Sequence, residues 1–264
     1  MILLVDAGNT RIKWALAAPG AALGDWLAWD ALPHADLAQL APAWRAALAG
    51  RALKRALLAN VAGAALGEQL RLALPAELPQ AAIEWFASLP QLAGLRNGYR
   101  NPAQLGCDRF AAAIGARALA PRQAIIVANC GTATTIDAIS ADGLFLGGMI
   151  LPGLGLMAGA LARNTAQLPQ LGQPGQPGQP GQHLALPAGF ADNTDDAILS
   201  GCLAAQAGAI ERAFAAHGAV QCIVSGGAAP FIAPTLTLPH RVVENIVLIG
   251  LHAASGAVVR DAAC

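Results

Sequence analysis

The opening segment of this sequence carries residues that could hold a nucleotide's phosphates. In ILLVDAGNTRIKWALA (2–17) an apolar run ends at Asp6, is followed by Gly8, Asn9 and Thr10, and then resumes with alternating apolar residues. This pattern predicts a strand, a tight turn and a returning strand. The turn offers a carboxylate, an amide, a hydroxyl and backbone N–H groups, which suit magnesium and phosphate oxygens. Taken alone, an ordinary Asx-type turn in a hairpin explains the same residues.

Two later segments repeat the strand–turn pattern. AIIVANCGTATTIDAIS (124–140) turns at Gly131-Thr132, and CIVSGGAAPF (222–231) turns at Ser225-Gly226-Gly227, where glycine allows a backbone to approach a ligand closely. Three such sites in this order indicate two related halves that close on a nucleotide. One turn from each half would hold phosphates, and the last turn would hold the adenosine. The layout resembles the superfamily of acetate kinases, sugar kinases, heat-shock ATPases and actin.

A separate segment joins the only tyrosine of the chain to an acidic–basic pair. It runs from Tyr99 through Gly106-Cys107 to Asp108 and Arg109, and apolar residues on one helical face follow it. The pattern places Asp108 at a helix N-terminus, where the helix dipole favours a carboxylate. Taken alone, such a pair is read more simply as a helix cap with Arg109 as its surface neighbour.

Composition limits the class of protein. The 264 residues have a formal net charge of zero and only 12% are charged, so we expect no surface for nucleic acid or an anionic membrane. Five scattered cysteines without a CxxC pair argue against disulfides and zinc, and favour a cytoplasmic location. Asp6 interrupts the opening apolar run, which argues against a signal peptide. The uncharged stretch 144–162 could span a bilayer by length, but its glycines and Pro152 predict a strand, a turn and a helix instead.

The order of expected elements predicts an α/β protein. The first half contains the opening hairpin, strands near 23–30, 54–62 and 81–86, and helices near 34–50, 64–73 and 107–119. The second half contains a strand, hairpin and strand over 124–151, helices at 153–165 and 193–217, a last strand at 222 and a helix near 243–259. This order resembles that of the ribonuclease-H-like unit of the superfamily. The resemblance implies two ribonuclease-H-like (actin-like ATPase) domains, 1–118 and 119–264, with mixed sheets flanked by helices and the nucleotide in the cleft between them. The Pro/Gly repeat within 172–182 excludes regular structure and predicts a flexible insert.

Together, these segments resemble those of type III pantothenate kinases, the enzymes that begin coenzyme A synthesis. The resemblance rests on Asp-x-Gly-Asn-Thr at 6–10, Gly-x-Asp-Arg at 106–109, Gly-Thr-Ala-Thr-Thr-x-Asp at 131–137 and Ser-Gly-Gly at 225–227. The motifs occur in the family's order over nearly the whole chain, and this combination is far more specific than any one of them. It implies ATP-dependent phosphorylation of pantothenate to 4′-phosphopantothenate.

The resemblance also implies roles for individual residues. Asp108 would accept the proton of the primary hydroxyl being phosphorylated, and Asp6 would help to place magnesium. ATP contacts are implied for Asp6, Ala7, Gly8, Asn9, Thr10, Arg11, Ile12, Lys13, Gly131, Thr132, Ser225, Gly226 and Gly227. Pantothenate contacts are implied for Tyr99, Gly106, Cys107, Asp108, Arg109 and Thr194. Arg109 would either hold the pantothenate carboxylate or fix Asp108 in place.

One position departs from the family pattern. Family members usually carry an aspartate two residues before Gly131 as a ligand of a monovalent cation, potassium or ammonium, and this chain has Asn129. An amide oxygen can still coordinate a cation, but the formal charge is lost. Asp137 would either compensate for that charge or cap the returning hairpin. The family's substrate pocket forms between two subunits, so the resemblance also implies a homodimer.

Two other kinds of function are compatible with parts of this sequence. Another kinase of the superfamily would act on acetate or a sugar, but the segment 99–109 argues against it. A regulatory accessory protein or an ATP-gated scaffold that kept the kinase fold is the alternative from another class. The presence of both Asp6 and Asp108 argues against a purely regulatory role. Walker-type kinases are excluded because no Gly-Lys-Ser/Thr motif occurs.

Overall fold

The computed structural model describes residues 1–76, 78–169, 171, 186–187 and 189–261, so the insert predicted at 172–182 lies outside the described residues. The described chain forms two compact units. Unit 1 comprises Met1–Pro121, Gly143–Leu146 and Asn245–Cys264, and unit 2 comprises Arg122–Asp142 and Gly147–Glu244. The division into domains 1–118 and 119–264 stays a prediction. The contacts place the C-terminal helix with unit 1.

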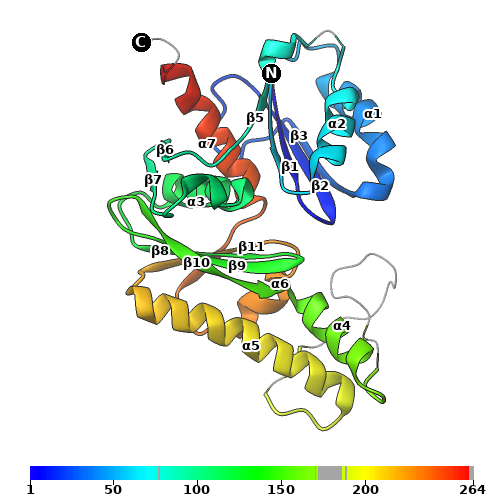
Figure 1. Cartoon of the computed structure of the whole chain (residues 1–264), viewed down its shortest axis with the longest axis vertical. Coiled ribbons are helices and arrows are strands. Elements are labelled where there is room, and N and C mark those ends of the chain that lie inside the picture. Colours follow the sequence, from blue (N-terminus) through cyan, green and yellow to red (C-terminus); the bar gives the residue numbers. More distant parts are fainter. Residues whose placement is uncertain (77, 170, 172–185, 188, 262–264) are drawn as a thin grey trace. The chain divides into compact units, whose positions relative to one another are not determined.

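Unit 1 is built on a mixed sheet of five strands in the order β3-β2-β1-β4-β5 (Figure 1). The strands are β1 (Ile2–Ala7), β2 (Arg11–Ala17), β3 (Ala28–Pro33), β4 (Arg55–Asn60) and β5 (Ile83–Trp85). β1, β2 and β3 pair antiparallel, whereas β1, β4 and β5 pair parallel. The carboxyl ends of β1 and β4 therefore lie side by side, with Ala7 opposite Asn60.

Helices cover both faces of this sheet. The helical elements of unit 1 are η1 (His34–Gln39), α1 (Leu40–Leu48), α2 (Ala64–Ala73), η2 (Gln80–Ala82), η3 (Pro102–Gln104), α3 (Cys107–Leu119) and α7 (Ile246–Asp261). Apolar residues of α1 and α2, such as Trp44 and Leu70, share a core with Leu3 and Val5 of β1. On the other face, α7 contacts β1 and β4. Burial on both faces explains why β1 and β4 are almost wholly apolar.

Helices α3 and α7 cross at unusually close range. A Cβ atom built on Gly250 would lie 1.7 Å from the carbonyl oxygen of Ala111, and one on Gly115 would lie 2.7 Å from that of Ile246. Only glycine fits at both points. This crossing holds α3, whose first turn carries Asp108 and Arg109.

Unit 2 contains the second mixed sheet. Its strands are β8 (Ile125–Cys130), β9 (Ala133–Ile139), β10 (Leu144–Pro152, whose first residues belong to unit 1), β11 (Gln221–Ser225) and β12 (His240–Val242), in the order β12-β11-β8-β9-β10. β8 pairs antiparallel with β9 and parallel with β11. The start of β10 pairs with β7 (Leu95–Asn97), which in turn pairs with β6 (Gln91–Leu92).

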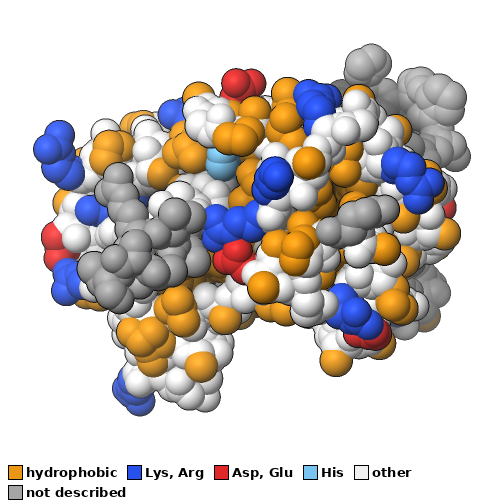
Figure 2. All heavy atoms as spheres, turned by 90° about the horizontal axis from the view of Figure 1, so that it is seen from above, with side chains coloured by type: hydrophobic (Ala, Val, Ile, Leu, Met, Phe, Trp, Pro, Cys, Tyr) orange, Lys and Arg blue, Asp and Glu red, His pale blue; other side chains and the backbone are white. Residues whose placement is uncertain are grey.

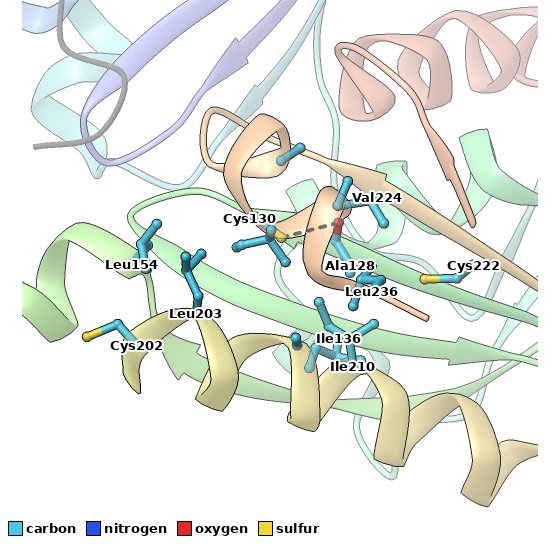
Figure 3. Packing of buried hydrophobic residues seen from close by; sticks show 14 of the residues in the cluster. Ala128, Cys130, Ile136, Leu154, Cys202, Leu203, Ile210, Cys222, Val224 and Leu236 are labelled. Carbon is cyan, nitrogen blue, oxygen red and sulfur yellow. Dashed lines mark hydrogen bonds between the residues drawn. The ribbon is translucent and has the colours of Figure 1, made fainter. Parts of the chain in front are cut away.

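One face of the unit 2 sheet packs on α4 (Leu154–Asn164), α5 (Thr194–His217), α6 (Ala229–Ile232) and η4 (Ala233–Thr235). Figure 3 shows this core, in which Ala128 and Cys130 of β8 and Val224 of β11 meet Leu203 and Ile210 of α5. The Cys130 thiol donates to the carbonyl of Ala128 at 3.9 Å. Asn193 caps α5 by accepting from the N–H of Asp196, and Gly218 ends the helix in a left-handed conformation.

The uncharged stretch 144–162 folds as the strand β10, the turn residue Gly153 and the helix α4, which confirms that prediction. None of the described helices has the length and apolar content that a membrane span needs. On the face drawn in Figure 2, lysine and arginine side chains are scattered among apolar ones.

Candidate active site

The opening turn joins β1 and β2 as a tight hairpin. The N–H of Gly8 donates to the carbonyl of Arg11 at 3.1 Å, and His34 Nε2 lies 2.9 Å from the carbonyl oxygen of Gly8. Asp6 stands directly opposite Lys13 across the two strands. The side chains of Ala7 and Ile12 are buried in the unit 1 core, so they could reach a ligand only through their backbone.

The first turn of α3 lies at the carboxyl end of the unit 1 sheet. The Cys107 thiol donates to the carbonyl of Asn60 at 3.7 Å, and Asn60 is the last residue of β4, opposite Ala7 of β1. This contact brings Asp108, the next residue, to the strand end that carries Asp6. The two carboxylates are close enough for Asp108 to raise the pKa of Asp6 electrostatically. Ligand sites commonly form at such strand ends.

Gly106 leaves the space that the Asp108 carboxylate occupies. A Cβ atom on Gly106 would lie only 2.6 Å from Asp108 Oδ1. The same oxygen accepts a hydrogen bond from the backbone N–H of Arg109 at 2.8 Å. Gly106 is the N-cap of α3, and its φ of −54° is open to any residue. Glycine is thus required here for the position of a carboxylate and not for backbone freedom.

Burial sets the protonation of this acidic pair. Asp6 is 8% exposed, and desolvation raises its pKa to about 6, with Lys13 lowering it and Asp108 raising it. Desolvation also raises the pKa of Asp108, against the lowering effect of Arg109. The Cys107 thiol has its pKa raised to about 11, mainly by burial, so it stays protonated. Two desolvated carboxylates close together therefore hold a proton more tightly than exposed ones do.

Arg109 lies buried in an aromatic setting. Its Nη1 donates to the Tyr99 hydroxyl at 2.9 Å, and its guanidinium carbon lies 5.7 Å from the centre of the Tyr99 ring and 5.9 Å from that of Phe145. The side chain of Asn97 holds the Tyr99 segment, because its Oδ1 accepts from the N–H of Tyr99 at 3.1 Å. The guanidinium of Arg109 contacts Tyr99 and Phe145, whereas its backbone N–H donates to Asp108 and its charge lowers the pKa of that carboxyl.

The glycine turns of unit 2 are brought together by the parallel pairing of β8 and β11. Gly226 has φ +94°, and a Cβ atom there would lie 2.4 Å from the carbonyl oxygen of Cys130. Gly153 lies against the other turn: its N–H donates to the carbonyl of Thr132 at 2.9 Å, and a Cβ would lie 2.1 Å from the carbonyl oxygen of Gly131. Both turns therefore depend on glycine at close backbone contacts.

Asn129 sits among neutral oxygens. It pairs with Thr135 of β9 and with Ser225 of β11, so the three side chains share one face of the sheet. Asp137 lies two residues beyond Thr135 on the same face and is 1% exposed. It lies inside β9, opposite Val127, and not at the turn residues 131–132.

Thr194 is placed differently from the other predicted substrate residues. It is the exposed first residue of α5 in unit 2, whereas Tyr99 and Gly106–Arg109 all belong to unit 1. Thr194 lines an open pocket of about 530 Å³ with Asp192, Asn193 and Ile198. Within a single chain, Thr194 thus lies beside residues of unit 2.

Sequence reasoning missed several residues that build these sites. Asn60 anchors Cys107, Gly153 supports the turn at 131–132, and Phe145 packs on Arg109. Of the three, only Gly153 carried a sequence signal, as a turn glycine after Pro152. Within the described part of the chain, no group of three or more His, Cys, Asp or Glu residues could hold a metal ion.

Comparisons with known proteins agree with one another. A family model described as type III pantothenate kinase matches residues 2–216. A relative named type III pantothenate kinase, from Herminiimonas arsenicoxydans, is 54% identical over 261 residues, covering 96% of both chains.

Solved structures extend the likeness at the level of fold. A Campylobacter jejuni protein described as a candidate Baf family transcriptional activator matches with a TM-score of 0.58 and 20% identity, over 99% of this chain and 100% of its own. A candidate 2-dehydro-3-deoxygalactonokinase from Sinorhizobium meliloti matches with a TM-score of 0.57 and 19% identity, over 98% and 99%. The predicted fold class, an α/β protein with mixed sheets flanked by helices, is confirmed, and the Sinorhizobium meliloti protein shares this fold.

Proposed function

This chain belongs to the type III pantothenate kinase family, and from that premise we propose how its own residues carry out the reaction. The chain is an ATP-dependent kinase that phosphorylates pantothenate to 4′-phosphopantothenate, the first step of coenzyme A biosynthesis. No comparison favours a regulatory accessory protein or an ATP-gated scaffold. The similarity to the Campylobacter jejuni protein, at 20% identity, concerns the fold alone.

Asp108 is the proposed proton acceptor. The primary hydroxyl of pantothenate forms a new bond to the γ-phosphorus, the bond to the β,γ-bridging oxygen breaks, ADP leaves and the hydroxyl proton passes to Asp108. Phosphoryl transfer depends mostly on positioning and charge stabilisation, so one oriented carboxylate is sufficient for this role. The observation that carries the proposal is the Asp108 carboxylate beside Asp6, in the space left by Gly106.

Asp6 is the proposed magnesium ligand. Magnesium usually binds one or two carboxylates together with substrate phosphates, so a cage of three protein ligands is not required. The residues fit such an ion, because Asp6 is buried beside a second carboxylate and both have raised pKa values that a divalent cation would lower. Bound magnesium would neutralise charge on the transferring phosphoryl group.

The three turns are the proposed ATP site. Gly8, Asn9, Thr10, Arg11 and Lys13 in unit 1, and Gly131 with Thr132 in unit 2, would donate to phosphate oxygens; Ala7 and Ile12 would contribute backbone groups only. Ser225, Gly226 and Gly227 would contact the adenosine. Support comes from the tight backbone contacts at Gly226 and Gly153, which keep these turns free of side-chain bulk.

A monovalent cation, potassium or ammonium, is the second proposed ion. The half-buried Asn129 amide, next to Thr135 and Ser225, offers the neutral hard oxygens that such a cation accepts. Asp137, buried on the same face, supplies the negative charge that position 129 lacks. Cation dependence with altered selectivity is the expected consequence.

The pantothenate site is proposed to include Tyr99, Gly106, Cys107, Asp108 and Arg109. Arg109 holds the carboxylate of pantothenate while its backbone N–H orients Asp108. Thr194 belongs to unit 2, whereas the other residues of this set belong to unit 1. In keeping with the family's substrate pocket between two subunits, Thr194 is proposed to come from a second copy of the chain.

A homodimer is therefore part of the proposal. Apolar side chains are exposed along β10 and the adjoining α4, at Met149, Ile150, Leu156 and Leu161. Exposed apolar side chains of this kind are typical of subunit interfaces. An Ile150→Asp variant should shift the protein toward monomer in light scattering. An unchanged mass would exclude this surface.

A cytoplasmic location is also proposed. Cys107, Cys130, Cys202 and Cys222 are all free thiols, as a reducing compartment would maintain them.

An ADP-release assay with product mass spectrometry tests the proposed function. The native protein should add one phosphoryl group to pantothenate in the presence of ATP, magnesium and potassium. Omission of magnesium should abolish turnover, and replacement of potassium by sodium should lower it. Turnover that is independent of both ions would contradict the proposed ion sites while leaving the kinase activity in place.

A further inference from the structure

Phe145 was not among the residues expected to matter, yet it is one of the largest fully buried side chains of the protein. It lies at the start of β10, opposite Asn97 of β7, within unit 1. Its ring meets the Tyr99 ring edge-on, with ring centres 5.7 Å apart. Its ring also lies within cation–π range of the Arg109 guanidinium, 5.9 Å from ring centre to guanidinium carbon.

Tyr99 and Phe145 together enclose the guanidinium of Arg109. The Tyr99 ring centre lies 5.7 Å from the guanidinium carbon, and the Tyr99 hydroxyl accepts from Nη1. Arg109 is only 7% exposed. A guanidinium packed against two rings loses much of the rotational freedom that a long arginine side chain has in water. The two rings therefore restrict where its remaining N–H groups can point.

The backbone of Phe145 also contacts the segment that carries Tyr99. Its carbonyl oxygen accepts from the N–H of Gly98 at 2.9 Å, and a Cβ atom on Gly98 would lie 2.3 Å from that oxygen. Gly98 directly precedes Tyr99, so this contact fixes the backbone from which the Tyr99 ring extends toward Arg109. Phe145 thus acts on Arg109 directly through its ring and indirectly through Tyr99.

We propose that Phe145 is a positioning residue for the acceptor substrate, which orients the Arg109 guanidinium toward the pantothenate carboxylate by packing with Tyr99 around it. The proposal rests on the proposed role of Arg109. Phe145 is fully buried, so its role is to position Arg109 and not to bind the substrate itself. Its loss should therefore weaken pantothenate binding while leaving ATP binding and the chemical step largely intact.

The test uses full-length Phe145→Leu, with Phe86→Leu as the matched control. Phe86 is also a buried phenylalanine of unit 1, and it stacks on Phe110 instead of on Arg109. We expect Phe145→Leu to raise the KM for pantothenate about tenfold, with the KM for ATP and kcat changed less than about twofold. Phe86→Leu should change none of these constants by more than about twofold, even if it lowers the thermal midpoint as much as Phe145→Leu does.

A double-mutant cycle separates this inference from the proposed function. Arg109→Met should raise the KM for pantothenate about thirtyfold, and adding Phe145→Leu to it should raise the KM no further. If Arg109→Met leaves that KM unchanged, the proposed role of Arg109 fails and the inference fails with it. If Arg109→Met acts but Phe145→Leu does not, or if the two effects multiply, only the inference is overturned. Should the leucine variant not fold, Phe145→Met tests the same prediction, because the flexible methionine side chain fills most of the space without supplying a ring.

Discussion

The acidic end of unit 1 and the glycine turns of unit 2 are built on opposite physical principles. In unit 1 the site is made of side chains, Asp6 and Asp108, whose burial raises both pKa values. In unit 2 the turns are formed by backbone groups, and Gly153 and Gly226 lie so close to carbonyl oxygens that a Cβ atom would collide with them. The first region should therefore respond to changes of charge at constant volume. The second should respond to added volume at constant charge.

The largest expected effect comes from a charge change at constant volume in unit 1. Asp108→Asn should lower kcat by about a thousandfold, since an amide cannot accept the hydroxyl proton. The KM for ATP should stay within about twofold of the native value, because Asp108 does not contact ATP in the proposed site. Steady-state kinetics measure both constants, and the exposed Asp30→Asn serves as the control. Near-native kcat in Asp108→Asn would remove this carboxylate from the chemistry.

The next effect comes from added volume in unit 2. Gly226→Ala should lower the free energy of unfolding by about 3 kcal/mol, since alanine is strained at φ +94° and its Cβ would collide with the Cys130 carbonyl. Gly208→Ala, with open space on the exposed side of α5, should instead raise it by about 0.5–1 kcal/mol. Urea denaturation of both variants provides the measurement. Equal stability of the two variants would show that the turn tolerates bulk.

The charge on Asp6 should itself destabilise the fold. Its pKa of about 6 lies above the ordinary value of 3.8, so the folded state binds the proton more tightly than the unfolded state and loses stability as pH rises from about 4 to above 6. The upper bound on this loss is about 3 kcal/mol. Asp6→Asn should thus be more stable than the native protein at pH 7.5 without ligands, and the difference should shrink toward pH 4.5.

Urea unfolding of Asp6→Asn and the native chain across this pH range measures the difference directly. Activity should be lost in the variant, because the proposed magnesium ligand is gone. A variant that is less stable than the native protein at pH 7.5 would contradict the assigned cost of burial.

The smallest expected effect comes from Gly106, where added volume would act on the position of a charged group. Gly106→Ala adds a methyl group that would lie 2.6 Å from Asp108 Oδ1, while φ of −54° permits alanine. The flexible carboxylate should move aside, so that kcat falls about tenfold while the thermal midpoint changes by no more than about 2 °C. Kinetics with differential scanning fluorimetry tests this pair of outcomes. A large loss of stability would mean that Gly106 serves the backbone and not the carboxylate.

The helices were the most predictable part of the fold. The expected helices at 64–73 and 107–119 match α2 and α3, and 193–217 matches α5 to within a residue, because caps and glycines mark their ends. Strands were less predictable. The strand expected at 23–30 is Ala28–Pro33, where pairing with β2 sets the bounds. The short exposed β12, and β6 and β7, were missed because two or three residues carry no periodicity.

The sequence by itself determined which chemical groups are present and in what order: the two aspartates, the glycine turns and the Asp-Arg pair, because motifs and caps are local. Only the tertiary structure decided which groups meet. The Cys107–Asn60 contact places Asp108 beside Asp6, and the Phe145 ring closes over Arg109. These contacts join segments far apart in the chain, and the pKa of a carboxylate depends on such neighbours and on burial, which no local pattern encodes.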